Sequence, residues 1–286
     1  NPFFQVFELR GRYPNRGYPK IFNDEKVGGE AKKLHNDALE MIQFIIKNNI
    51  LQLRGIVGLL PANAKGTEDV EVYTDESRSE VAATFCMLRQ QADLVGGDDI
   101  YRSLADFVAP KDIPDYLGMF AVSCFGCEEQ CAIYEADHDD YSKIMLQALA
   151  DRFVEAFAEC VHKDMRTQMW GYAADEKLSE EDLLKVKYQG IRPAPGYPSQ
   201  PDHTEKLTMW KLLEVEEKTG IKLSDSLSMM PAASVSALVF AHPESQYFAV
   251  GQVAKDQVTD YASRKNMEVP AVEKWLGSVL GYDEDV

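Results

Sequence analysis

The sequence has no apolar run long enough to span a membrane, and basic residues are scarce in it. Its 30 lysines and arginines stand against 47 aspartates and glutamates, which leaves a net charge of −17. Nucleic acid is therefore not the expected partner, because phosphate binding needs clustered basic side chains. The negative charge is compatible with docking to a partner protein that has a basic surface. No charged and then apolar leader opens the chain. The five cysteines indicate free thiols in a reducing compartment, and the cytoplasm is the expected location.

Two kinds of motif are also missing. No Gly-x-Gly turn follows a predicted strand, which counts against a Rossmann nucleotide site. No serine, histidine and aspartate follow one another in the manner of a hydrolase triad. We therefore expect no catalytic side chain and no metal site, and a nucleotide-like ligand would have to be held in some other way.

The apolar pattern indicates an α+β fold around a mainly antiparallel sheet, because helix-like and strand-like periods intermix without a βαβ rhythm. Hydrophobic residues make up 45% of the 286, enough for a substantial core. The expected helices cover 30–49, about 140–170, 204–219, 256–265 and 270–276. The expected strands cover 54–60 (ended by Pro61), 70–74, 118–123, 234–240 and 246–253, the last two as a hairpin; 81–88 fits strand or helix, and 95–99 a loop. No linker forces a boundary, so one domain is expected over 1–286.

Two short patterns predict helix starts. Ser179-x-x-Asp182 and Asp202-x-x-Glu205 both resemble capping boxes, the second opening a helix that Gly220 would end. The acidic run 137–140 around His138 precedes the longest helix. Carboxylates at this position stabilise the positive N-terminal end of a helix, and we favour this interpretation over a metal site.

The segment 190–206 is unusually rich in proline, at 193, 195, 198 and 201. Proline fixes φ, removes a backbone donor and pushes the preceding residue towards extended geometry, so this ribbon is neither helix interior nor central strand. Within it, Arg192 is a natural partner for a carboxylate, Gly196 allows close approach to the backbone, and Tyr197 offers a flat ring with a polar tip. A surface linker and a binding strip both fit these residues.

Other candidate residues have plainer interpretations. Cys124, Cys127 and Cys131 have a spacing that suggests zinc or an iron–sulfur cluster, but no fourth cysteine lies near and the stretch continues into a predicted helix, so small buried hydrophobes are favoured.

Glu155, Glu159 and His162 line one face of the longest helix, which predicts a solvated row. If that helix edges a cleft, Glu155 could meet an ammonium or a ribose hydroxyl. His203 either serves a site at the ribbon or begins the following helix.

The ribbon and many other stretches resemble the S-adenosylmethionine-binding activation domain of cobalamin-dependent methionine synthase. The matching stretches, in order, are 2–4, 103–110, 139–141, 148–152, 170–172, 192–198, 201–206, 247–250, 256–258, 275–276 and 280–283. They cover essentially the whole chain.

The resemblance implies a C-shaped α+β domain from the C-terminus of a larger methyltransferase in methionine biosynthesis. There, S-adenosylmethionine remethylates cobalamin that has been oxidised and then reduced by an electron donor. The residues implied at the ligand are Arg192, Ala194, Pro195, Gly196, Tyr197, Tyr247, Phe248, Glu155 and His203. Arg192 is expected to hold the methionyl carboxylate. An acidic ligand residue of the family falls just upstream of Asn1 and is absent here.

The resemblance also implies partners and cofactors. Cobalamin is expected on a neighbouring domain of the same enzyme, zinc in the full-length enzyme only, and the electron donor is a flavodoxin or a flavoprotein reductase. Two rival functions are a docking module for that reductase without ligand binding, and a radical enzyme with a cluster on the three cysteines.

Overall fold

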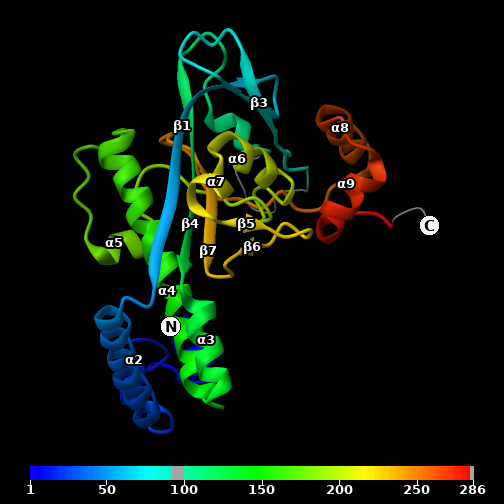
Figure 1. Cartoon of the computed structure of the whole chain (residues 1–286). Coiled ribbons are helices and arrows are strands. Elements are labelled where there is room, and N and C mark those ends of the chain that lie inside the picture. Colours follow the sequence, from blue (N-terminus) through cyan, green and yellow to red (C-terminus); the bar gives the residue numbers. More distant parts are fainter. Residues whose placement is uncertain (92–99, 284–286) are drawn as a thin grey trace. The chain divides into compact units, whose positions relative to one another are not determined.

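The computed structural model describes residues 1–91 and 100–283 (Figure 1). The chain divides into two compact units, each built from three stretches of sequence. The first unit comprises Asn1–Arg54, Val122–Glu159 and Met229–Val235, and the second comprises Gly55–Ala121, Cys160–Ser228 and Ser236–Val286. The loop expected at 95–99 lies outside the described residues. The single domain expected over 1–286 stays a prediction.

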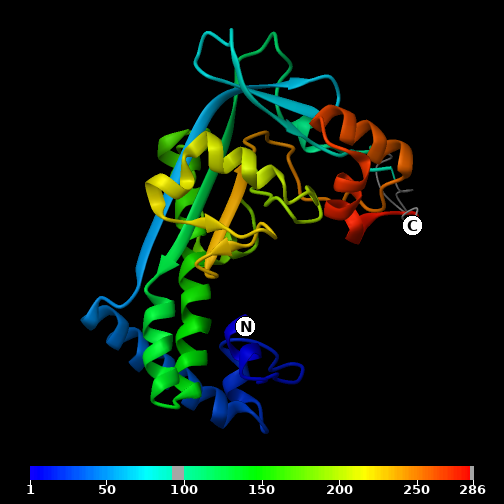
Figure 2. The same cartoon turned by 45° about the vertical axis from the view of Figure 1, so that its right-hand side comes forward.

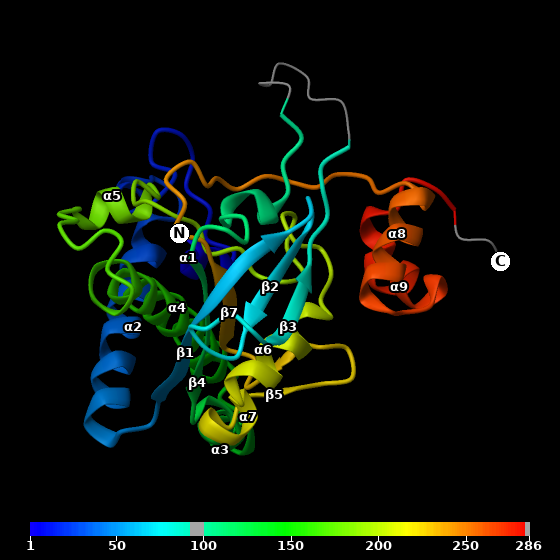
Figure 3. The same ribbon diagram turned by 90° about the horizontal axis from the view of Figure 1, so that it is seen from above.

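The fold is α+β, as the sequence predicts, and its main sheet has the strand order β3-β2-β1-β4-β7 (Figures 1 and 3). The strands of this sheet are Gln52–Lys65 (β1), Asp69–Tyr73 (β2), Val81–Cys86 (β3), Asp115–Phe125 (β4) and Ser234–Val239 (β7). Two short strands are Lys222–Leu223 (β5) and Met229–Met230 (β6). β2 pairs antiparallel with both β1 and β3, so the ambiguous segment 81–88 is mainly a strand.

Pro61 does not end β1, and that prediction is wrong. The pairing of β1 with β2 begins at Ala62, opposite Val72. That ladder starts one residue after the proline, so it requires no N–H from Pro61.

The first unit contains mainly helices. They are Pro2–Val6 (α1), Gly28–Asn48 (α2), Cys127–Ala136 (α3) and most of Asp140–Asp164 (α4). The buried residues Ala31, Leu34, Ala38 and Ile45 recur in α2 at intervals of three, four and seven, which confirms the predicted amphipathic helix. α3 and α4 lie side by side (Figure 2), and the Cys131 Sγ contacts the Lys143 carbonyl at 3.9 Å.

The longest helix, α4, starts at Asp140 as predicted, but its α-helical part ends at Asp164, before the predicted end at about 170. The Asp139 carboxylate accepts a hydrogen bond of 3.0 Å from the Ser142 N–H, which lowers the pKa of Asp139 and supports the interpretation of the acidic run as a helix start. At its other end the helix continues into a π-helical turn over Met165–Met169.

The helices of the second unit are Glu180–Leu184 (α5), Glu205–Leu213 (α6), Val215–Thr219 (α7), Lys255–Lys265 (α8) and Val269–Leu276 (α9). Short 3₁₀ turns occur at Lys20–Asn23, Leu104–Phe107 and Gly277–Val279. The single helix expected over 204–219 is broken because Glu214 adopts a left-handed φ of 52°, while Gly220 ends α7 as predicted. α8 and α9 pack side by side (Figure 3) around Val258, Tyr261 and Leu276.

Only one of the two predicted capping boxes forms. Ser179 and Asp182 cap α5 reciprocally, as predicted. At α6 the prediction is wrong: Asp202 accepts from the Thr204 N–H at 2.7 Å, but Glu205 turns away and accepts from the Lys265 ammonium at 2.6 Å.

The proline ribbon lies along the edge of β7. Ile191 and Phe240 exchange two backbone hydrogen bonds of 3.0 Å, and the Leu238 N–H donates to the Pro193 carbonyl at 3.0 Å. The hairpin predicted between 234–240 and 246–253 is therefore wrong, since the ribbon occupies this edge of β7 and no regular strand forms over 246–253. Instead, the Val250 N–H donates to the Pro198 carbonyl at 2.8 Å.

Candidate functional site

The centre of the ribbon is a pair of tight turns. The Tyr197 N–H donates to the Ala194 carbonyl at 3.1 Å, and the Gly196 N–H donates to the Gln200 carbonyl at 2.7 Å. Gly196 has φ +97°, and a Cβ built there would lie 2.1 Å from the Cε1 of His203. Only glycine fits this position, because both its backbone conformation and the imidazole packed against it exclude a side chain. His203 thus packs directly on the ribbon as well as preceding α6.

Arg192 is held at both its backbone and its side chain. Its N–H donates to the Tyr247 hydroxyl at 3.0 Å, and its guanidinium Nη1 donates to His162 Nδ1 at 3.0 Å and to the Tyr188 hydroxyl at 3.3 Å. The fold therefore brings together Arg192 and Tyr247, which sequence analysis assigned to one site although they lie 55 residues apart.

The other predicted site residues of the second unit follow Arg192 or Tyr247 in the sequence. Ala194 and Gly196 are half-buried, Pro195 is buried, and Tyr197 is exposed. Phe248 faces inward: its ring lies 6.4 Å from that of Phe107, and its carbonyl accepts from the Ser199 hydroxyl at 2.7 Å. Tyr247 keeps 49% of its surface exposed while its hydroxyl is bound.

Glu155 is exposed on the part of α4 that belongs to the first unit. Its expected place at the ligand stays a prediction.

His162 contradicts the solvated row predicted along α4, because its side chain is fully buried. Burial is the main cause that lowers its pKa, and the positive charges of Arg166 and Arg192 add to it, giving a value of about 2. His162 is thus a neutral imidazole. Sequence reasoning missed it because the helix period places it beside the charged row, whereas its partner Arg192 comes from the distant ribbon.

Arg166 is a second buried residue that sequence reasoning missed. It forms a two-pronged ion pair with Glu176, at 2.8 and 2.7 Å, and its guanidinium stacks 4.1 Å from the centre of the Tyr188 ring. A sequence signal exists: His162 and Arg166 are four residues apart, each adjacent to a residue of the apolar stripe, Val161 and Met165.

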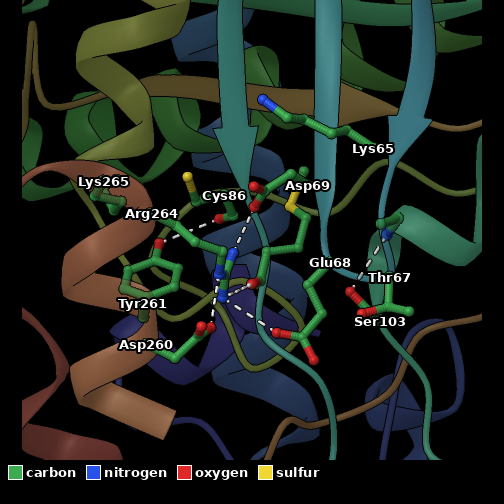
Figure 4. Close-up of polar contacts among 12 residues, drawn as sticks. Lys65, Thr67, Glu68, Asp69, Cys86, Ser103, Asp260, Tyr261, Arg264 and Lys265 are labelled. Carbon is green, nitrogen blue, oxygen red and sulfur yellow. Dashed lines mark hydrogen bonds and ion pairs between the residues drawn. The ribbon is translucent and has the colours of Figure 1, made fainter.

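A buried ionic cluster anchors the far end of the ribbon. The Lys265 ammonium on α8 donates to Asp202 at 2.8 Å, to Thr204 at 2.7 Å and to Glu205 at 2.6 Å. Tyr261 donates to Asp202 at 2.8 Å and also contacts the Cys86 carbonyl (Figure 4). One ammonium faces two carboxylates, and full burial raises the pKa of Glu205 to about 7.

A neighbouring ionic cluster ties the same helix to β2. Arg264 contacts Asp69, Glu68 and Asp260 (Figure 4). Together the two clusters fix α8 beside the end of β3 and beside the far end of the ribbon.

Cys127 and Cys131 lie in α3, which confirms the helix predicted there. Their sulfur atoms are 3.8 Å apart, and burial raises the pKa of both thiols. Cys124 is buried as well, and its pKa is raised to about 11. Among the residues described, no group of three or more His, Cys, Asp or Glu side chains is arranged to hold a metal ion. In the same part of the chain, no helix combines the length and apolarity needed to cross a membrane.

Comparison with known proteins identifies the family. The model for the activation domain of vitamin B12-dependent methionine synthase matches residues 1–266. The crystal structure of the MetH reactivation domain bound to AdoHcy superimposes with a TM-score of 0.93 at 50% sequence identity, covering 99% of this chain and 85% of that one. The ribbon, its partner Tyr247 and the α+β sheet thus belong to a known architecture. This chain is a member of the activation-domain family of vitamin B12-dependent methionine synthase, a methyltransferase.

Proposed function

We propose that the ribbon of this domain binds S-adenosylmethionine and presents its methyl group to cobalamin on a neighbouring domain of the enzyme. The observation that carries the proposal is the hydrogen bond from the Arg192 N–H to the Tyr247 hydroxyl. It places the half-exposed ring of Tyr247 against the ribbon backbone at Arg192, whose side chain is the cation. The relative in the comparison is bound to AdoHcy, the same nucleoside without the transferable methyl group.

The residues present fit such a ligand. The Arg192 guanidinium is a bidentate partner for the amino-acid carboxylate. No hydrogen bond among the described residues uses the Ala194 N–H, so this donor can serve the adenosine. The rings of Tyr197 and Tyr247 can favour the sulfonium charge by cation–π attraction, worth about 0.5–2 kcal/mol. The ribbon would contact the ligand through Pro195 and Gly196, with Phe248 and His203 packed nearby. Glu155 is proposed to meet a polar group of the ligand.

This assignment agrees with the absence of an acid–base constellation in the sequence. Cobalamin supplies the nucleophilic cobalt that takes the methyl group, and the displacement from sulfonium requires no proton transfer. The domain has only to orient the ligand and leave its methyl carbon uncovered. Positioning of this kind lowers a barrier by up to about 7–11 kcal/mol. The electron donor that prepares the cobalt is proposed to be a flavodoxin or a flavoprotein reductase.

Titration calorimetry of the domain with S-adenosylhomocysteine tests the proposal. Arg192→Ala removes the proposed clamp, that is, the guanidinium that binds the ligand carboxylate. It is expected to weaken binding on the order of 100-fold, since hydrogen bonds between charged groups are lost. Arg12→Ala, at an exposed arginine of the first unit, is the matched control and is expected to bind as the wild type does. Equal affinity of Arg192→Ala and the wild type would refute the clamp. Absence of wild-type binding would favour the docking module without a ligand.

A further inference from the structure

A relay of hydrogen bonds runs inward from Arg192. Its Nη1 lies 3.0 Å from His162 Nδ1, and His162 Nε2 lies 3.5 Å from the Tyr172 hydroxyl. The Tyr172 hydroxyl in turn lies 3.4 Å from the carbonyl of Gln189, three residues before Arg192. The relay therefore begins and ends on the same segment of chain.

The direction of each hydrogen bond follows from the chemistry of the groups. A guanidinium only donates, so His162 Nδ1 has to accept and carries no proton. The proton of the neutral ring then lies on Nε2 and points at the Tyr172 oxygen, whose own proton points at the Gln189 carbonyl. The last two contacts are long and weak, so the short one to Arg192 dominates.

The surroundings keep His162 in this acceptor state. Charged and titratable groups reach the ring from each element packed on it: Arg166 from its own helix, Tyr172 after the π-helical turn, and Tyr188 and Arg192 from the segment that leads into the ribbon. The Tyr188 ring packs edge-on at 5.0 Å. Glu176 neutralises Arg166. A proton added to Nδ1 would face the Arg192 guanidinium directly, which excludes the imidazolium.

We propose that His162 is a positioning residue that orients the Arg192 guanidinium through Nδ1 and so governs affinity for the amino-acid end of the ligand. The inference rests on the proposed function, and it assigns the effect to one part of the ligand. An arginine on a flexible stem has many rotamers, and a fixed acceptor behind it selects the one that the carboxylate requires.

Two amide substitutions separate this role from a merely structural one. In His162→Asn the side-chain oxygen stands where Nδ1 stood, because both atoms are bonded to Cγ. In His162→Gln the amide reaches the position of Nε2 instead. The probes are S-adenosylhomocysteine, which has the carboxylate, and 5′-methylthioadenosine, which lacks the amino-acid portion, both measured by calorimetry on the domain.

We expect His162→Asn to bind S-adenosylhomocysteine nearly as the wild type does and His162→Gln to bind it about tenfold more weakly. Both variants should bind 5′-methylthioadenosine as the wild type does, which also shows that they are folded. His138→Asn, at an exposed histidine, is the control for the substitution itself.

Equal affinities of the Asn and Gln variants for S-adenosylhomocysteine would overturn the positioning role, as would an equal loss of both ligands in His162→Gln. Those outcomes do not contradict the proposed function as long as Arg192→Ala weakens the binding of S-adenosylhomocysteine. If Arg192→Ala has no effect, the clamp itself fails, and the two failures are thus distinguished.

Discussion

Gly196 shows how much a single residue can determine at this site. Its φ of +97° is one that L-residues rarely adopt, and the space of a Cβ is taken by the His203 ring. The sequence indicated that glycine permits close approach to the ribbon, and the structure identifies the group that approaches.

We predict that Gly196→Ala lowers the free energy of unfolding by about 1–3 kcal/mol and weakens ligand binding, because the backbone is strained and the imidazole is displaced. Gly66→Ala is the matched control: Gly66 also has a positive φ, +62°, but nothing lies within 4 Å of its Cβ position. It should show the backbone strain without the loss of affinity. Urea unfolding and calorimetry measure both effects, and equal behaviour of the two variants would contradict the steric role of His203.

His162 gives a prediction about pH. Its pKa in the folded protein, about 2, lies below the ordinary value of 6.5, so the unfolded chain takes up a proton that the folded protein does not. This histidine therefore contributes fully above pH 6.5, and its contribution falls as the pH is lowered, by at most about 1.4 kcal/mol per pH unit.

The measurement is urea unfolding at pH 7 and pH 5. Between these values the wild type should lose about 2 kcal/mol more stability than His162→Asn, which cannot take up the proton. Equal losses in wild type and His162→Asn would show that the buried imidazole takes up a proton as readily as it does in the unfolded chain.

At the scale of elements, α8 holds the far end of the ribbon in place through the ion pairs of Lys265. Its ammonium is the shared partner of Asp202 and Glu205, both almost fully buried. A buried ion pair is sensitive to the loss of one partner, because the remaining charge stays without compensation.

We predict that Lys265→Met lowers the free energy of unfolding by about 3–5 kcal/mol at pH 8, since two buried carboxylates lose their counter-ion. Lys274→Met, at an exposed lysine of α9, should change stability by less than about 0.5 kcal/mol. Adding Asp202→Asn and Glu205→Gln to Lys265→Met should restore most of the stability. If the triple variant is no more stable than the single one, packing and not charge explains the loss.

The same elements show where sequence reasoning succeeds and where it ends. Periodicity located α2 and α4, because the apolar residues of their buried faces recur every three or four positions in the sequence. The box at Ser179 and Asp182 was predicted correctly since both partners are local. The box at Asp202 failed because Glu205 binds Lys265, 60 residues away. Likewise, the partner of Phe240 is Ile191 of the ribbon and not the segment that follows β7.

At the scale of the whole molecule, charge and composition constrained function by exclusion, whereas family resemblance identified it. The net charge of −17 excluded nucleic acid as the expected partner but named no ligand. Arg192, Gly196 and Tyr247 were chosen from the sequence, and the fold places the Tyr247 hydroxyl against the ribbon backbone at Arg192. His162, Tyr188 and Arg166, which support Arg192, were not chosen, because the helix period places His162 beside the charged row and its partner Arg192 comes from the distant ribbon.

The ribbon has a further consequence for solubility. β7 ends the five-stranded order, and an unprotected outer strand recruits other chains by backbone pairing. Pro193 accepts a hydrogen bond from Leu238 yet has no N–H to offer to a newcomer, and Pro195 lacks one as well. The segment proposed to hold the nucleoside thus also blocks edge-to-edge association, so damage to it should produce aggregation together with loss of methyl transfer.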